Sequence, residues 1–211
     1  MFEAETPAEA DSGPNARSRV LAASALAIAT PFREAAGRPD PETVDMPALA
    51  MATVAAPVGV AMLGRFVEGL ALGGLVPAIA LALAGALICA LMTSLAVITL
   101  WVIEAVARRK DKLDDIGLPR AYAYATAFLC TCGLPNNGLA GLCLLLLTVA
   151  TVAGGFRRLR ERPTPNALAT VMTGPAIGFL AFYTGVTVFF ASRIREPLLG
   201  MVSALLTAVF G

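Results

Sequence analysis

Histidine is absent from this sequence of 211 residues. It is the commonest side chain for acid–base catalysis near neutral pH and the commonest metal ligand in proteins. Its absence therefore argues against most serine hydrolases, rhomboid-like proteases and zinc proteases. The sequence also lacks a Walker-type phosphate loop, a dinucleotide-binding fingerprint and a nucleophile elbow. We therefore expect no catalytic residues, no cofactor and no bound metal, and we do not expect an enzyme.

Charged residues are scarce as well, at 15% of the chain, whereas about a quarter of the residues of a soluble domain are charged. The net charge is only +1, so no basic excess indicates nucleic acid as a partner. Hydrophobic residues make up 57% of the chain. Several uncharged segments reach the roughly 20 residues that cross a hydrocarbon core of about 30 Å. The composition predicts an all-α fold, a polytopic helical bundle that is integral to a membrane.

Cysteines are few, and all four lie inside apolar segments, at Cys89, Cys130, Cys132 and Cys143. Free cysteine behaves as a small buried hydrophobic residue, so we expect these side chains to pack in the core without a disulfide framework. Cys130 and Cys132 are two residues apart and point to different sides of a helix. A metal site shared by this pair is therefore not expected.

Five transmembrane helices are predicted from the uncharged segments of residues 46–192. Their expected ranges are about 46–64, 77–107, 116–133, 139–156 and 166–192. Residues 65–68 should form a brief loop after the first span. Three glycines and a proline make residues 69–77 an irregular entry to the second span.

The two ends of the chain are expected to lie outside the spans. Residues 1–19 are rich in acids, proline and glycine and are expected to form a disordered tail. Residues 20–30 are apolar but too few to span, and Pro31 should end this segment. We expect residues 1–45 to combine the acidic tail with an interfacial amphipathic helix, which is anchored by Arg17 and Arg19 and continues beyond Pro31 through residues 32–34. Residues 193–211 form a short apolar tail that is also expected at the interface.

The basic residues predict which side of the membrane each loop faces. With a cytoplasmic N-terminus, four Lys or Arg precede the first span, five lie in residues 108–120 and four lie in residues 157–162. The far side carries only Arg65, Arg193 and Arg195. If residues 20–30 also crossed the membrane, the N-terminal tail would move outside while both basic loops would stay inside.

The second predicted span carries a row of small residues. They recur at every fourth position within 35 uncharged residues between Glu68 and Glu104, at Ala78, Ala82, Ala86, Ala90 and Ser94. Residues four apart lie above one another in a helix, and small side chains permit the close approach on which helix association in lipid depends. We predict a helix-packing face formed by this row, and a second contact at Gly174 and Gly178, which have GxxxG spacing.

The basic residues next to the spans could also bind anionic lipid headgroups, at roughly 1 kcal/mol for each charge near the surface. The candidates are Arg108, Arg109, Lys110, Lys112, Arg157, Arg158 and Arg160. However, the retention of basic loops on the cytoplasmic side already explains these residues without any lipid binding. Asp114 and Asp115, beside Arg120, could hold a divalent ion or a lipid phosphate. They lack the further acids of a phospholipid-synthesising D-x-x-D-G motif, so a solvated loop is the simpler interpretation.

Several short motifs share the pattern of one family. Residues 120–124 (RAYAY) open the third predicted span, and residues 133–135 (GLP) close it. Residues 154–157 (GGFR) end the fourth span, and residues 166–169 (NALA) precede Pro175 in the fifth. These motifs resemble the Yip1 family of small membrane proteins, and residues 29–34 (ATPFRE) resemble the amphipathic lead-in of its bacterial members.

The resemblance to the Yip1 family implies five spans, a cytoplasmic N-terminus and no catalytic residues. The Asp-Leu-Tyr-Gly-Pro type motif of the eukaryotic branch is absent, so Rab-GTPase binding does not carry over. The resemblance implies a membrane scaffold or interaction protein of a bacterial cytoplasmic (inner) membrane.

We expect a non-enzymatic scaffold that acts through helix packing and cytoplasmic basic loops. Its expected partners are membrane lipids and either another membrane protein or further copies of itself in a homo-oligomer. Two alternatives stay open. A small permease or channel component would need a polar path built from Ser, Thr, Tyr, Cys and the backbone freed by Pro57 and Pro175. A lipid-handling enzyme would use Asp114 and Asp115.

Overall fold

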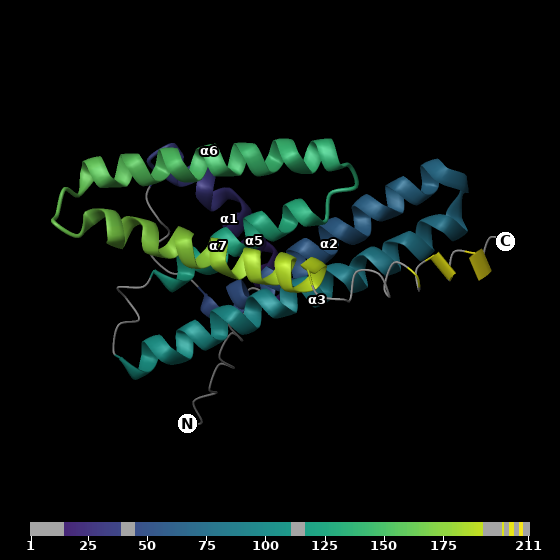
Figure 1. Cartoon of the computed structure of the whole chain (residues 1–211), viewed down its shortest axis with the longest axis horizontal. Helices are drawn as coiled ribbons and strands as arrows, with labels where there is room; N and C mark the ends of the chain where they lie inside the picture. Colours follow the sequence, from purple (N-terminus) through teal and green to yellow (C-terminus); the bar gives the residue numbers. More distant parts are fainter. Residues whose placement is uncertain are drawn as a thin grey trace, which may run out of the picture.

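The computed structural model of the protein describes residues 15–38, 45–110 and 117–191, together with residues 200, 203, 204, 207 and 208. These residues form helices and no strand, which confirms the predicted all-α helical bundle (Figure 1). The helices are α1 (Ala16–Ala35), α2 (Met46–Gly73), α3 (Leu75–Arg109), α5 (Leu118–Cys132), α6 (Asn137–Glu161) and α7 (Ala167–Ala191). Residues 1–14 of the predicted acidic tail and most of the predicted C-terminal tail lie outside the described residues, whereas residues 16–19, predicted as part of the disordered tail, form the start of α1.

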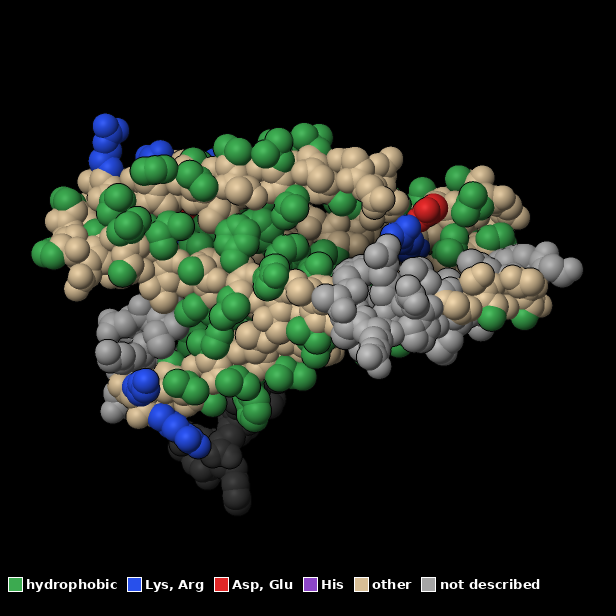
Figure 2. Space-filling model, in the orientation of Figure 1, with side chains coloured by type: hydrophobic (Ala, Val, Ile, Leu, Met, Phe, Trp, Pro, Cys, Tyr) green, Lys and Arg blue, Asp and Glu red, His purple; other side chains and the backbone are tan. Residues whose placement is uncertain are grey.

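Four helices, α2, α3, α6 and α7, are long and apolar enough to cross a membrane. The helix at the third predicted span, α5, has only 15 residues and is about 22 Å long, which is shorter than a hydrocarbon core. Four of the five predicted spans therefore correspond to helices of spanning length. Figure 2 shows one face of the molecule covered largely by hydrophobic side chains, as a lipid-facing surface requires.

Helix α5 forms the centre of the bundle. Every residue from Ala121 to Thr131 is buried, and α5 packs against α1, α2, α6 and α7. The Phe128 ring centroid lies 4.2 Å from that of Phe179 and 5.6 Å from that of Phe182, both on α7. A helix that is enclosed on all sides has no face for water, so it must be apolar almost all round.

Glycines on α7 let this helix lie directly against α5. A Cβ atom at Gly174 would lie 2.9 Å from Cβ of Arg120, and one at Gly178 would lie 2.7 Å from Cβ of Tyr124. Both distances are shorter than ordinary carbon–carbon contacts, so a larger residue at either position would force the helices apart. Gly174 and Gly178 therefore contact α5 within one chain.

Helices α2 and α3 form a hairpin that closes at Gly74. Helix α2 continues through residues 65–73, so the predicted loop at residues 65–68 is wrong, and the irregularity predicted for residues 69–77 is confined to Gly74. Its two charges are tolerated inside the helix because Arg65 Nη1 pairs with Glu68 Oε2 one turn later, at 2.5 Å. Gly74 has a φ of 107°, a backbone conformation that is strained for residues with a side chain.

Helix α1 packs against α2, α5 and α6. It continues through Pro31 to Ala35 and so includes residues 32–34, over which the interfacial helix was predicted to continue. Gly37, with a φ of 67°, closes the helix, and two backbone hydrogen bonds return from this turn to the last turn of α1. The position of α1 at the membrane interface stays a prediction.

The basic helix termini lie at one end of the bundle. The C-termini of α3 and α6 and the N-termini of α5 and α7 are at this end (Figure 1). The α2–α3 turn and the connection from α5 to α6 are at the opposite end. We call the first of these the basic end of the bundle.

Candidate functional site

Glu34, in the last turn of α1, is a buried carboxylate whose side chain is only 1% exposed. Arg120 Nε donates to Oε1 at 2.8 Å and Arg120 Nη2 donates to Oε2 at 3.0 Å, so two bonds join the guanidinium to the carboxylate. The Tyr124 hydroxyl donates to Oε2 at 2.6 Å. Arg158 Nη2 donates to Oε1 at 3.2 Å. We call these four residues the Glu34 cluster.

Helix geometry and one glycine assemble the Glu34 cluster. Arg120 and Tyr124 are four residues apart in α5, so both side chains lie on one face of that helix. Arg158 lies in the last turn of α6. One turn earlier, a Cβ atom at Gly154 would lie 3.1 Å from Cβ of Glu34. Glycine at this position therefore lets α1 approach α6 closely enough for the arginine to reach the carboxylate.

The Glu34 cluster satisfies a charge that would otherwise be costly to bury. An unpaired buried carboxylate loses several kcal/mol of hydration free energy, which only close partners can offset. Two guanidinium groups and a phenol donate hydrogen bonds to one carboxylate here, so the four residues of the cluster have a formal net charge of +1. Among the described residues, no buried side-chain nitrogen or oxygen lacks a hydrogen-bond partner. The cluster thus joins α1 to α5 and α6.

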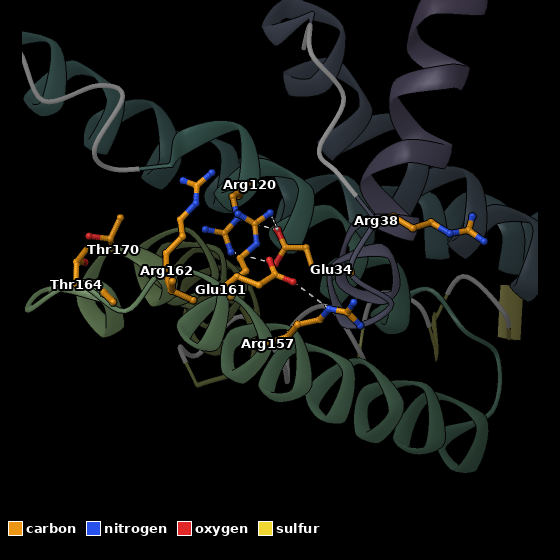
Figure 3. Close-up of a pocket in the computed structure, with 12 residues that line it drawn as sticks. Glu34, Arg38, Arg120, Arg157, Glu161, Arg162, Thr164 and Thr170 are labelled. Atoms are coloured by element: carbon orange, nitrogen blue, oxygen red, sulfur yellow. Dashed lines mark hydrogen bonds and ion pairs between the residues drawn. The ribbon is translucent and has the colours of Figure 1, made fainter.

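The Glu34 cluster borders a pocket of about 610 Å³ at the basic end of the bundle. The pocket lies between the C-terminal ends of α1 and α6 and the N-terminal ends of α5 and α7 (Figure 3). Its charged lining residues are Glu34, Arg38, Arg120, Arg157, Arg158, Glu161 and Arg162. Glu161 Oε1 pairs with Arg157 Nε at 3.2 Å. We call this cavity the basic pocket.

Two helix N-termini add to the positive potential of the basic pocket. Ala167 and Thr170, from the first turn of α7, line the pocket, and so does Arg120, from the first turn of α5. The first backbone N–H groups of a helix have no intrahelical acceptor and carry partial positive charge. The chemistry of the pocket is therefore that of an anion-binding site.

The structure places two of the predicted lipid-contacting residues in this pocket. Arg157 and Arg158 line it, and Arg158 also belongs to the Glu34 cluster. Arg160 lines a more open groove on the neighbouring surface of α6. The fourth basic residue of this loop, Arg162, was not among the predicted contacts but also lines the basic pocket.

The remaining predicted lipid contacts lie at the end of α3. Arg108 Nη2 pairs with Glu104 Oε1 at 2.5 Å, and Glu104 Oε2 also accepts a 3.3 Å bond from the Tyr122 hydroxyl of α5. Arg109 and Lys110 are exposed beside this pair. Lys112 lies outside the described residues, as do Asp114 and Asp115.

The row of small residues on α3 does not stay on one buried face. Ala78 and Ala82 are buried, Ala86 and Ala90 are half-buried, and Ser94 is exposed. Each residue turns an α-helix by about 100°, so a row of every fourth residue drifts by about 160° between Ala78 and Ser94. The buried residues of α3 instead follow the helical repeat, at Ala78, Ala82, Cys89, Met92, Thr93, Ala96, Leu100 and Ala107.

The four cysteines are free, with Cys89 and Cys130 buried and Cys132 and Cys143 half-buried. No group of three or more acids or cysteines that could hold a metal ion occurs among the described residues.

Sequence reasoning missed the Glu34 cluster, because its members are 86 and 124 residues apart along the chain. One local signal exists. Arg120 and Tyr124 are two hydrogen-bonding side chains on the same face of a largely apolar helix, which implies a polar partner on a neighbouring helix. The identity of that partner requires the tertiary fold.

Comparisons with protein-family models, curated proteins and solved structures find no match to this chain.

Proposed function

We propose that this protein is a non-enzymatic integral membrane scaffold or interaction protein of the Yip1 type. It lies in a bacterial cytoplasmic membrane with its N-terminus inside. It acts through helix–helix contacts within the bilayer and through the basic end of the bundle at the cytoplasmic surface. Its partners are membrane lipids and another membrane protein or further copies of itself.

The observation that supports this proposal is that separate motifs of the family resemblance meet in space. Glu34 ends the ATPFRE motif, Arg120 and Tyr124 belong to RAYAY, and Gly154 begins GGFR. These four residues all belong to or directly border the Glu34 cluster. A fully paired cluster of this kind fixes helices relative to one another, which is the property that a scaffold requires.

The basic end supports the proposed orientation. Arg108 and Arg109 end α3, and residues 157–162 end α6, at the same end of the bundle (Figure 1). Loops that are rich in Lys and Arg are retained on the cytoplasmic side. Both basic loops therefore predict the same orientation, with the basic end of the bundle facing the cytoplasm.

Exposed apolar side chains supply the surface for contacts inside the bilayer. On α3, Leu83, Leu87 and Ile98 are 64%, 59% and 55% exposed, and Trp101 is 66% exposed near the basic end. Lipid acyl chains can cover such an apolar surface. A helix of a partner protein can replace the lipid when its shape is complementary to the surface.

Site-specific photo-crosslinking in native membranes tests the scaffold proposal. A photoreactive amino acid replaces Leu87, which is exposed on α3, and in a matched variant it replaces Leu100, which is fully buried on the same helix. We expect the probe at position 87 to capture a defined protein partner or a second copy, and the probe at position 100 to capture neither. Lipid adducts alone at every exposed position of α3, α6 and α7, combined with solute flux in proteoliposomes, would overturn the scaffold proposal in favour of a permease.

A further inference from the structure

We propose that the basic pocket binds the phosphate group of an anionic ligand. The shared chemistry is a phosphate ester, and either the headgroup of a membrane phospholipid or a soluble phosphate compound can supply it. The inference deepens the proposed function and rests on it in one respect, the position of the basic end at the cytoplasmic surface of the membrane.

The charge of the side chains that line the pocket favours an anionic ligand. Among the described residues, five arginines and two glutamates line the pocket, and these have a formal net charge of +3. Glu34 is shared between Arg120 and Arg158, and Glu161 pairs with Arg157. An anion in the pocket would balance this surplus, and guanidinium groups bind phosphate oxygens through two parallel N–H donors.

The Glu34 cluster fixes part of this positive charge in place. The side chains of Arg120 and Arg158 are only 16% and 25% exposed, and both donate hydrogen bonds to Glu34. An arginine that is already ordered loses little conformational entropy when a ligand binds. Figure 3 shows Arg162 extending from the end of α6 between Arg120 and the threonines of the α6–α7 connection and of α7.

The α7 helix provides a second, independent contribution to anion binding. Its N-terminal residue Ala167 lines the pocket together with Thr170 and Val171, and with Thr164 of the preceding connection. The backbone N–H groups of Ala167 and Thr170 already donate to the carbonyl oxygens of Thr164 and Asn166. A phosphate beside this 25-residue helix would therefore be stabilised by the positive end of the helix dipole and by the threonine hydroxyls.

The size and surroundings of the pocket favour a lipid among the two sources. Its volume of about 610 Å³ lies within the range of small-molecule sites and exceeds what a lone phosphate ion needs. Phe156, which directly precedes Arg157, is 70% exposed, and Leu168, which directly follows Ala167, is 63% exposed. Phe156 lines the neighbouring groove together with Arg157 and Glu161, which line the pocket as well, so its side chain offers an apolar surface to the acyl chains of a bound phospholipid.

Lipid binding to the purified full-length protein tests the proposal. The probes are nanodiscs of phosphatidylcholine alone and nanodiscs that contain phosphatidic acid, with the retained lipid measured by native mass spectrometry. The pocket variant combines Arg157→Gln with Arg162→Gln. These substitutions remove two positive charges from exposed residues of the pocket lining and leave the Glu34 cluster intact. The matched control combines Arg108→Gln with Arg109→Gln, which remove the same charge at the same end of the bundle but outside the pocket.

We expect the pocket variant to lower the retention of phosphatidic acid at least tenfold, and the control variant to change it less than twofold. Glycerol 3-phosphate distinguishes the two sources. Competition by millimolar glycerol 3-phosphate would assign the site to a soluble phosphate ester, and retention of the lipid despite this competitor would assign it to a headgroup. Equal losses in the two variants, or no preference for phosphatidic acid over phosphatidylcholine, would overturn the proposal, because diffuse surface charge would then explain the binding.

The outcome is separable from that of the scaffold proposal. Crosslinking from position 87 reports protein contacts on α3, which lie away from the pocket. A pocket variant that loses phosphatidic acid but keeps the crosslinked partner supports both proposals. A wild-type protein that crosslinks a partner but shows no phosphate binding would overturn the inference alone.

Discussion

At the scale of single residues, Glu34 is a buried carboxylate that joins three helices. Its carboxylate is buried at the meeting point of three helices, and it is the shared acceptor for Arg120, Arg158 and Tyr124. A buried ion pair contributes little compared with a well-packed apolar pair, but removing only one partner leaves the other charge buried and unpaired. The Glu34 cluster is therefore far more sensitive to single substitutions than its net contribution to stability suggests.

Replacing Glu34 by glutamine should destabilise the protein strongly. Glu34→Gln keeps the shape of the side chain but takes the shared anion away from two guanidinium groups, and the expected loss is about 3 kcal/mol. Thermal unfolding in detergent measures this loss. A thiol-reactive fluorescent dye reports the transition, because Cys89 and Cys130 are buried and become accessible only on unfolding.

The matched control for Glu34 is Glu161→Gln in α6. Glu161 also pairs with an arginine, but its side chain is 57% exposed, so its loss should cost less than about 1 kcal/mol. Equal thermal shifts for the two variants would contradict the structural role of the Glu34 cluster.

The residue-scale features were the hardest to predict from the sequence. The basic loop of residues 157–162 was recognised from its charge, but a topological role and a binding role have the same composition. Glu34 stood in a short amphipathic segment beside Arg33, where a charged residue normally faces water. Only the packing of α1 against α5 and α6 reveals that this carboxylate is buried.

At the scale of helices, the bundle is organised around a short element rather than its longest one. Helix α3 has 35 residues and is the most prominent segment of the sequence, whereas α5 has 15 residues and occupies the core. The close contact between α5 and α7 depends on glycines, because helix association in lipid is driven by close packing and not by the exclusion of water.

Adding one methyl group to α7 at its contact with α5 should destabilise the bundle. In Gly178→Ala the new Cβ would lie 2.7 Å from Cβ of Tyr124 and 2.9 Å from the carbonyl oxygen of Ala121. Overpacking of this kind costs about 1–3 kcal/mol. Gly141→Ala on α6 is the control, because no atom lies within 4 Å of its new Cβ. The thermal-unfolding assay should separate the two variants, and equal stability would contradict the close contact between α5 and α7.

The small residues of α3 should differ in their tolerance of leucine. Ala78 is fully buried and adjoins Gly69 of α2, so Ala78→Leu should push the hairpin apart at a cost of about 1–3 kcal/mol. Ser94 is exposed, so Ser94→Leu should change the stability by less than about 0.5 kcal/mol. If both variants lost stability equally in detergent, the whole row of small residues would act as one packing face, as its spacing predicts.

The sequence predicted the existence of the helices better than their ends. Apolar length was sufficient to identify α2, α3, α6 and α7, since uncharged segments of this size have few other structures available. The loop at residues 65–68 was mispredicted because Arg65 and Glu68 neutralise each other along one helix face.

At the scale of the whole molecule, the direction of α5 determines how the chain is threaded through the membrane. The C-terminus of α3 and the C-terminus of α6 lie at the same end of the bundle (Figure 1). If α3 and α6 both cross a bilayer in this arrangement, α5 must lead the chain to the opposite side before α6 returns it. The short length of α5 is compatible with this path because α5 contacts other helices and not lipid over most of its surface.

Cysteine labelling in intact cells tests this threading most directly. Single cysteines replace Arg109 at the end of α3, Asn137 at the start of α6 and Arg160 at the end of α6, three exposed positions. The wild-type protein, whose four native cysteines lie in apolar segments, serves as the control. Its labelling by a membrane-impermeant maleimide measures the background reaction of these cysteines. We expect labelling of position 137 in intact cells, and labelling of positions 109 and 160 only after the membrane is permeabilised. Labelling of positions 109 and 160 from opposite sides would contradict the account, because α5 would then fail to carry the chain across.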